Sequence, residues 1–331
     1  MKGNKKSSSK LWRAVVTFIA VLAMANVFGC SGGGGGGGGA PAGITYTGVT
    51  TQALIDENNA YDIAVEAVTA DKTTSSLNVL GAVEQKTTSQ QNFLVFDISQ
   101  NLQNVIYKIE ANINTLYIGA IQSDSDTIAG ICGGNFTYNL SVNDVSGDFN
   151  GTISFNNYCE EGINISGNVS VSGNINVNTS EISYLGMTFN NIQAKDGQES
   201  IGMNGSLDFY MGYPSWQMIM SLVIKDNIRN ETFKYQNVKY NYTEYSNYTQ
   251  FTFTGRFYHE EYGYVEMTTL SPFTIYDYWP TTGTALAEGQ NGTKAKLTII
   301  DSSSFLVEAD TDGDGSFDDY NSGPILWSSM L

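Results

Sequence analysis

The chain has 331 residues, with 16 basic and 33 acidic side chains and a net charge of −17 at pH 7. Five of the basic residues and none of the acidic ones lie in the first 13 residues, so the rest of the chain has 11 basic and 33 acidic side chains, a net charge of −22. This composition argues against nucleic-acid binding and against docking of the folded surface on anionic lipid, because both need basic patches. A strongly acidic surface favours solubility and attracts cations.

The N-terminus has the order of segments that is typical of a secretory signal. The basic residues are Lys2, Lys5, Lys6, Lys10 and Arg13. They precede an apolar run from Ala14 to Val27, which is shorter than the about 20 apolar residues of a transmembrane helix. A basic segment followed by a short apolar segment predicts export, with residues 1–29 as the signal peptide.

The signal ends in Val27-Phe28-Gly29-Cys30, which resembles the lipobox of bacterial lipoprotein precursors. The resemblance implies that the Cys30 thiol receives a diacylglyceryl group, that the peptide is cut before Cys30, and that acyl chains such as palmitate anchor the protein in a membrane. Phe28 departs from the small residue that is usual at its position. The alternatives are an ordinary secretory signal with a chance cysteine, and a retained membrane anchor.

Residues 30–43 follow as the lipidated cysteine and a tether. Ser31 is followed by eight glycines, a flexible coil that lets a folded domain stand away from the bilayer. Position two of the mature chain is Ser31 and not aspartate, which in enteric-type sorting resembles lipoproteins sent to the outer membrane. We therefore expect a lipid-anchored protein of the cell envelope, in the outer membrane, on its periplasmic or surface face. Beyond the anchor, the chain resembles Gly-linked lipoproteins of Gram-negative bacteria, and this resemblance implies no mechanism.

Two cysteines remain after Cys30, namely Cys132 and Cys159. An even pair in an exported protein predicts a disulfide. The closed loop of about 28 residues would stabilise the fold by about 3 kcal/mol in the chain-entropy model. A metal-binding pair is the alternative, although no cluster of histidines or further cysteines accompanies it.

The sequence of the first part of the folded region predicts a short strand and two helices. Residues 44–48 are expected to form an opening strand. Residues 52–70 are expected to be helical, with Asn59 as an N-cap and an apolar face that contains Ile63, Ala64, Ala67 and Val68. Residues 92–112 repeat apolar side chains at i, i+3, i+4 and i+7, which predicts a second helix.

From about residue 115, short runs of alternating polarity are separated by Gly, Asn and Asp. Phe136, Tyr138 and Leu140, for example, alternate with Thr137 and Asn139. This two-residue period is typical of half-buried antiparallel strands. Turn residues recur about every eight to twelve positions. The sequence therefore predicts a mainly β fold, a many-stranded antiparallel meander, sandwich or barrel-like sheet with one or two N-terminal helices packed against it, as a single domain over residues 44–331.

The strongest local motif is Asp-Thr-Asp-Gly-Asp-Gly at residues 310–315, which resembles the D-x-D-x-D-G opening of calcium loops. Calcium takes six to eight oxygen ligands. The ligands predicted from this pattern are Asp310, Asp312, Asp314, Ser316 through its carbonyl group, Asp318 and Asp319. An EF-hand is excluded, because Asn321 stands where that motif has glutamate and the flanking residues predict strands. The alternative is an Asp/Gly hairpin turn that holds no ion.

No catalytic constellation stands out, and we expect no enzymatic activity. His259 is the single histidine and is interpreted as a surface residue, since a triad or a zinc site needs further partners that no motif supplies. A glycosidase pair is not excluded, because acidic residues are plentiful. Tyrosines are concentrated between residues 235 and 278, beside Trp279. They are interpreted as cross-strand aromatic pairs, with sugar stacking as the alternative.

These observations favour a lipid-anchored envelope protein with a non-enzymatic binding or structural role. The membrane is its expected partner through the acyl chains, nucleic acid is not, and an envelope protein, a glycan or a lipid remains open. Two other functions stay as alternatives: a carrier of a lipid or other hydrophobic ligand, and a carbohydrate-binding or carbohydrate-active protein. Calcium is the one cofactor expected, in a structural role.

Overall fold

The computed structural model describes residues 43–69, 121–143, 145–160, 162–176, 181–196, 199–276 and 279–329. They form two compact units. Unit 1 comprises the described residues of 43–44 and 121–212, and unit 2 those of 45–69 and 213–329. Cys30, the glycine tether and the expected helix over 92–112 lie outside the described residues. The single domain over residues 44–331 stays a prediction.

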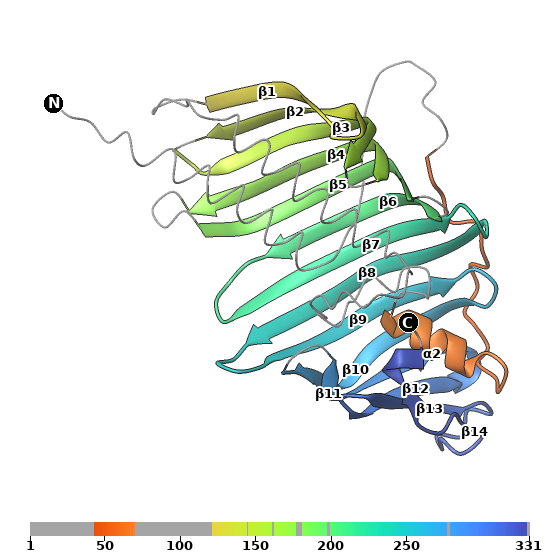
Figure 1. Cartoon of the computed structure of the whole chain (residues 1–331). Coiled ribbons are helices and arrows are strands. Elements are labelled where there is room, and N and C mark those ends of the chain that lie inside the picture. The colour runs from red at the N-terminus through yellow and green to blue at the C-terminus, as the bar shows by residue number, and fades with distance from the viewer. Residues whose placement is uncertain are drawn as a thin grey trace. The chain divides into compact units, whose positions relative to one another are not determined.

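Unit 1 is an antiparallel meander, which confirms the expected fold class (Figure 1). Its described strands pair in the order in which they follow one another along the chain. They are β1 (Ile121–Ala129), β2 (Gly133–Asn143), β3 (Asp148–Glu160), β4 (Ile163–Asn176), β5 (Glu181–Asp196) and β6 (Glu199–Tyr210).

The alternating sequence explains why strands β2–β6 of unit 1 have two different faces. In β2, Phe136 and Tyr138 are buried, while Thr137 and Asn139 between them are exposed. Successive side chains of a strand point to opposite faces, so apolar residues at every second position gather on one face. Each fully buried large apolar side chain stabilises the fold by about 1.5–3 kcal/mol. The other face is polar.

Unit 2 is a second antiparallel meander with one described helix, α2 (Ala60–Thr69). Strand β15 pairs with β13 beside β14. The strands are β7 (Ser215–Asp226), β8 (Glu231–Glu244), β9 (Thr249–His259), β10 (Gly263–Ile275), β11 (Pro280–Glu288), β12 (Lys294–Asp301), β13 (Ser304–Asp310), β14 (Tyr320–Asn321) and β15 (Ile325–Leu326). Two short 3-10 helices are η1 (Gln290–Gly292) and η2 (Trp327–Ser329).

Helix α2 packs against β9 and β11–β13 in unit 2 (Figure 1). The expected apolar face is confirmed, because Ile63, Ala64, Ala67 and Val68 are all buried. The sheet opposite is rich in small buried residues, namely Ala285, Ala287, Ala295 and Ala309. Alanine on both surfaces lets the helix backbone approach the sheet closely.

The helix is shorter than the sequence predicts, because residues 52–59 are not helical. Gln52 forms an isolated parallel β-bridge with Tyr264, in which the Ala53 amide donates to the Tyr264 carbonyl group at 2.8 Å. The Asp56 carboxylate then accepts the amides of Asn58 and Asn59 at 2.8 and 3.1 Å. This local turn competes with helical hydrogen bonding and delays the helix to Ala60.

The opening strand expected over residues 44–48 is also wrong, since these residues join no strand ladder. Side chains of unit 2 hold the segment instead. The Thr47 amide donates to Thr232 Oγ1 at 3.1 Å, and the Tyr46 hydroxyl donates to the His259 carbonyl group at 2.8 Å. Burial raises the pKa of Tyr46, with the charge of Glu260 adding to the effect, so this hydroxyl stays a donor.

A repeated bulge interrupts the strand register in both units. Asn157, Asn191 and Asn237 have φ values of 47°, 55° and 51°, and each lies at a register shift. Asparagine tolerates this left-handed conformation better than most residues. The tripeptide Phe-Asn-Asn occurs at residues 155–157 and again at residues 189–191, and in both places it forms a bulge.

Each bulge is held by a polar side chain of the neighbouring strand. The amides of Asn157, Asn191 and Asn237 donate to Ser166 Oγ at 3.2 Å, Asn204 Oδ1 at 2.6 Å and Ser221 Oγ at 3.1 Å. These amides leave the regular ladder at the bulge, so a side-chain acceptor satisfies them. In all three bulges, the amide of the left-handed asparagine thus donates to a side-chain oxygen of the neighbouring strand.

Candidate functional site

The acidic loop between β13 and β14 brings three of the expected ligands together. Asp310, Asp312 and Asp314 each place one carboxylate oxygen within 4.8 Å of the others. Asp310 is fully buried, whereas Asp312 and Asp314 are exposed. A group of three carboxylates could hold a metal ion, and hard oxygen donors of this kind suit calcium.

The loop owes its shape to hydrogen bonds that its own carboxylates accept. Asp310 accepts the Gly313 amide on Oδ1 at 2.7 Å and the Gly315 amide on Oδ2 at 2.9 Å. Asp312 accepts the Asp314 amide at 3.0 Å. Gly313 and Gly315 have φ values of 79° and 96°, which residues with a Cβ rarely adopt. Each Asp310 oxygen keeps a second lone pair that could face an ion.

The remaining expected ligands have other places in the loop. Asp319 Oδ2 accepts the amides of Thr311 at 2.6 Å and Asp312 at 3.2 Å and so joins the two ends of the loop. The hydrogen bond from the Thr311 amide is the main cause that lowers the pKa of Asp319. Asp318 and Asp319 are not members of the group of three. The Ser316 amide donates to Asp314 Oδ1 at 2.7 Å.

Cys132 and Cys159 form a disulfide, with their Cα atoms 5.1 Å apart. The bond joins the turn after β1 to the end of β3, and the Cys132 amide also donates to the Cys159 carbonyl group at 3.3 Å. Disulfides persist in oxidising compartments, so the pair indicates an extracytoplasmic location. Because both sulfur atoms are used in the bond, they do not form the alternative metal pair.

His259 is half-buried between α2 and the sheet, contrary to its interpretation as a surface residue. Its Nε2 lies 3.0 Å from Glu66 Oε2, and both side chains are 14% exposed. Its Nδ1 accepts the amides of Glu261 at 3.1 Å and Tyr262 at 3.4 Å. The ring stacks on Tyr262 with centroids 4.3 Å apart. The arrangement ties the helix to the end of β9.

Two opposing effects act on the pKa of His259. Burial is the largest and lowers it, but the hydrogen bond and charge of Glu66, with Asp62 and Glu261 adding to them, leave the pKa above its ordinary value. Protonation of Nδ1 would end its two contacts with backbone amides, which limits the rise. Nothing in the spacing of residues 66 and 259 reveals this pair, since only the packing of α2 brings them together.

Part of the tyrosine cluster belongs to the apolar face of unit 2, while Tyr245 and Tyr276 are exposed. Tyr235, Tyr240 and Tyr242 are buried, and Tyr242 lies opposite Phe251 with ring centroids 5.5 Å apart. Burial raises the pKa of Tyr240 and Tyr242, so both stay neutral. Cross-strand aromatic pairing accounts for these residues.

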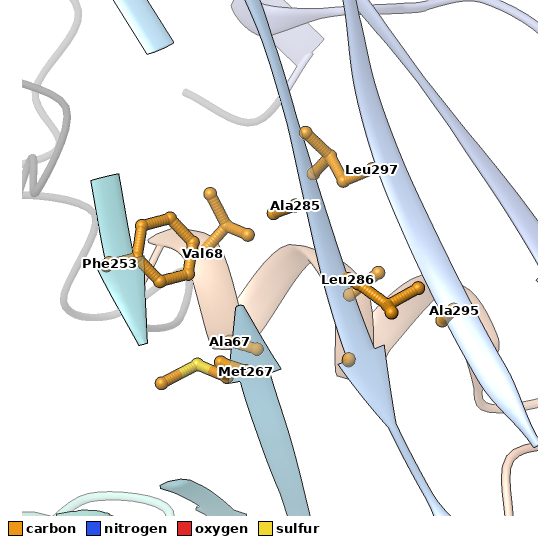
Figure 2. Close-up of a pocket in the computed structure, with 10 residues that line it drawn as sticks. Ala67, Val68, Phe253, Met267, Ala285, Leu286, Ala295 and Leu297 are labelled. Carbon is orange, nitrogen blue, oxygen red and sulfur yellow. The ribbon is translucent and has the colours of Figure 1, made fainter. Parts of the chain in front are cut away.

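A small apolar cavity lies between α2 and the sheet of unit 2 (Figure 2). Ala67 and Val68 of the helix face Phe253, Met267 and Leu297 across it. Its volume is about 10 Å³, about the space of one water molecule. A lipid chain does not fit at this place.

Helix α2 lacks the length and apolarity to cross a membrane, and the described residues offer no other helix that could.

The outward face of unit 1 contains a second polar cluster that sequence reasoning missed. The Tyr184 hydroxyl donates to Asp208 Oδ1 at 2.6 Å, and the Tyr184 and Tyr210 ring centroids are 5.2 Å apart. Burial, and then the hydrogen bond to Asp208, raise the pKa of Tyr184 to about 12. Only the register of β5 with β6 joins these residues, and that register shifts at the Asn191 bulge.

Comparison with known proteins adds no relative to these observations: no family model, curated protein or solved structure matches the chain.

Proposed function

We propose that this chain is an exported, lipid-anchored protein of the cell envelope with a non-enzymatic binding or structural role. The Cys132–Cys159 disulfide supports the export part of the proposal, because such bonds are rare in reducing compartments. The basic and apolar segments before Cys30 also support export, because their order is typical of a secretory signal. The two features are independent, since one is a packing relationship and the other a sequence pattern.

The anchor in this proposal is an acylated Cys30. Several acyl chains give stable membrane attachment, where one alone is marginal. The glycines that follow Ser31 separate the anchor from the first described residues. Ser31 in the second mature position favours the outer membrane over the inner one.

Calcium has a structural role in this proposal, bound by the group of Asp310, Asp312 and Asp314. Asp312 and Asp314 are exposed carboxylates close together, and their mutual repulsion is relieved by a bound cation. The loop joins β13 to β14, so an ion there would stabilise the end of the sheet of unit 2.

Labelling cells with palmitate tests the anchor. The full chain should incorporate label and fractionate with membranes, and Cys30→Ala should lose both properties. Ser31→Ala is the matched control, because it changes the neighbouring side chain but leaves Cys30 and the lipobox intact, and it should keep the label. Unchanged labelling of Cys30→Ala would overturn the lipid anchor, whereas an unlabelled wild type found in the periplasm would leave export alone standing.

A further inference from the structure

The middle of the outward face of unit 1 is a regular array of uncharged polar side chains. The backbone pairing places six of them in one row across six strands: Ser125, Asn139, Thr152, Ser170, Thr188 and Ser206. Directly opposed residues of antiparallel strands share a face, so these side chains form a continuous line. All six are exposed or partly exposed.

Two parallel rows flank this central row. One contains Thr127, Thr137, Ser154, Asn168 and Asn190. The other contains Ser123, Ser141, Asn150, Ser172, Gly186 and Asp208. Asp208 is the one charged residue in the three rows, in a chain with 33 acidic residues. Asp148 and Lys195 lie on the same face beyond the rows, on opposite sides of them. Solvent-facing sheet surfaces ordinarily use charge for solubility, so its near absence here calls for another explanation.

We propose that this face binds an extended, uncharged polysaccharide that runs across the strands. The inference deepens the proposed function, and it rests on that function because the polymer must lie outside the cytoplasm. Asparagine, serine and threonine side chains both donate and accept hydrogen bonds, as sugar hydroxyl groups do. Rows of uncharged side chains do not select an anionic polymer, and a chain with 33 acidic residues repels one.

The spacing of the array fits such a polymer. Neighbouring strands lie about 4.8 Å apart, so six strands give a row about 24 Å long. One strand spacing is close to the length of one pyranose unit in an extended chain, so successive sugars meet successive strands. Each hydrogen bond adds little alone, about 0.5–1.5 kcal/mol, and the row provides several in register.

An aromatic pair at the end of the array supplies the apolar contact that sugar rings favour. Tyr184 and Tyr210 are paired directly, so they lie on the same outward face, next to Gly186 and Asp208. Tyr210 is 46% exposed, and its ring is open to the C–H face of a sugar. The Asp208 carboxylate and the Ser172 hydroxyl lie beside it, both in contact with the Tyr184 hydroxyl.

The test is retention of the full chain, purified in detergent, on insoluble polysaccharides. Cellulose, curdlan and mannan are the uncharged probes, and cross-linked polygalacturonate is the anionic one. At least one uncharged polymer should deplete the protein from solution, and the anionic one should not. No retention on any of the three uncharged polymers overturns the inference, as does equal retention on polygalacturonate.

Charged substitutions locate the binding face. The triple variant Thr152→Lys, Ser170→Lys and Thr188→Lys should weaken retention at least tenfold, because it places three long charged side chains on the central row. The control Thr254→Lys, Thr284→Lys and Thr298→Lys adds the same charge to unit 2, and should bind within twofold of the wild type. Equal binding by both triple variants would move the site elsewhere.

Tyr210→Ala gives a second measure without added charge, and it should weaken retention about tenfold while the melting temperature falls by only a few degrees. Unaltered retention of this variant would remove the aromatic contact from the proposal. Palmitate labelling separates this inference from the proposed function. A labelled, membrane-bound protein that binds none of the polymers leaves the proposed function standing and the polysaccharide inference refuted.

Discussion

Gly134 in β2 lies directly against the backbone of Asn157 in β3, where a Cβ atom on the glycine would overlap the Asn157 carbonyl group. Gly134 itself has a φ of 61°, and Asn157 opposite it has a φ of 47°. Two left-handed residues therefore meet across one strand pair. Gly167 stands in the same relation to Asn191, which shows that the bulge is a device used more than once.

Gly134→Ala should destabilise unit 1 by at least about 2 kcal/mol, because left-handed strain of about 1–2 kcal/mol adds to the overlap with Asn157. Gly162→Ala is the matched control, since Gly162 has a φ of 93° but nothing lies within 4 Å of its missing Cβ. The control should show the strain alone. Thermal unfolding measures both variants, and equal shifts would mean that the contact with Asn157 has no energetic weight.

The strands were predictable because a two-residue period follows directly from the geometry of a half-buried strand. The Cys132–Cys159 bond followed from an even cysteine count in an exported chain, and the acidic loop from its spacing of aspartates. The bulges were not predictable, because asparagine has only a weak preference for the left-handed conformation. The hydrogen bond from the Asn157 amide to Ser166, which stabilises that conformation, forms only in the folded sheet. The start of α2 was misplaced for a similar reason: Ala53, Leu54 and Ile55 look like part of an apolar helical face, but the Asp56 turn separates them from the helix.

The polar pairs outside the acidic loop were less predictable than the fold, because their members lie far apart in sequence. Asp310, Asp312 and Asp314 are neighbours in one loop, so a local pattern found them. Glu66 and His259 meet only when α2 packs on the sheet. Tyr184 and Asp208 meet only in the exact register of β5 and β6, which a one-residue slip would destroy.

Calcium should raise the melting temperature of the full chain by a few degrees. A site with a dissociation constant of about 1 mM contributes about 1.4 kcal/mol at 10 mM calcium. Asp312→Ala should abolish the shift, because it removes one of three grouped carboxylates. Asp318→Ala removes the same charge from the same loop but lies outside the group, and it should keep most of the shift. A wild type that shows no shift at 10 mM calcium would leave an Asp/Gly turn that holds no ion.

The disulfide should stabilise unit 1 alone. Cys132 and Cys159 are separated by 27 residues, and opening this loop in the double alanine variant should cost about 3 kcal/mol. Amide hydrogen exchange in β2 and β3 should accelerate, while β12 and β13 of unit 2 serve as the internal reference. Equal acceleration in all four strands would mean that the bond stabilises the whole chain through one cooperative transition.

His259 should make the attachment of α2 depend on pH. Its pKa in the folded protein is above the ordinary value of about 6.5, so protonation contributes stability that is fully present below the unfolded pKa and is lost as the pH rises through the folded one. The melting temperature of the wild type should therefore fall relative to that of His259→Gln as the pH rises from about 6 through the pKa of His259 in the folded protein.

Glu66→Gln is the companion variant for this pair. It keeps a side chain of similar size and a hydrogen-bond acceptor for His259 Nε2, but it removes the charge that helps to raise the histidine pKa. Its pH profile should flatten towards that of His259→Gln. If Glu66→Gln retains the full pH dependence of the wild type, the carboxylate does not set the protonation of His259, and the remaining acidic neighbours, Asp62 and Glu261, would have to account for it.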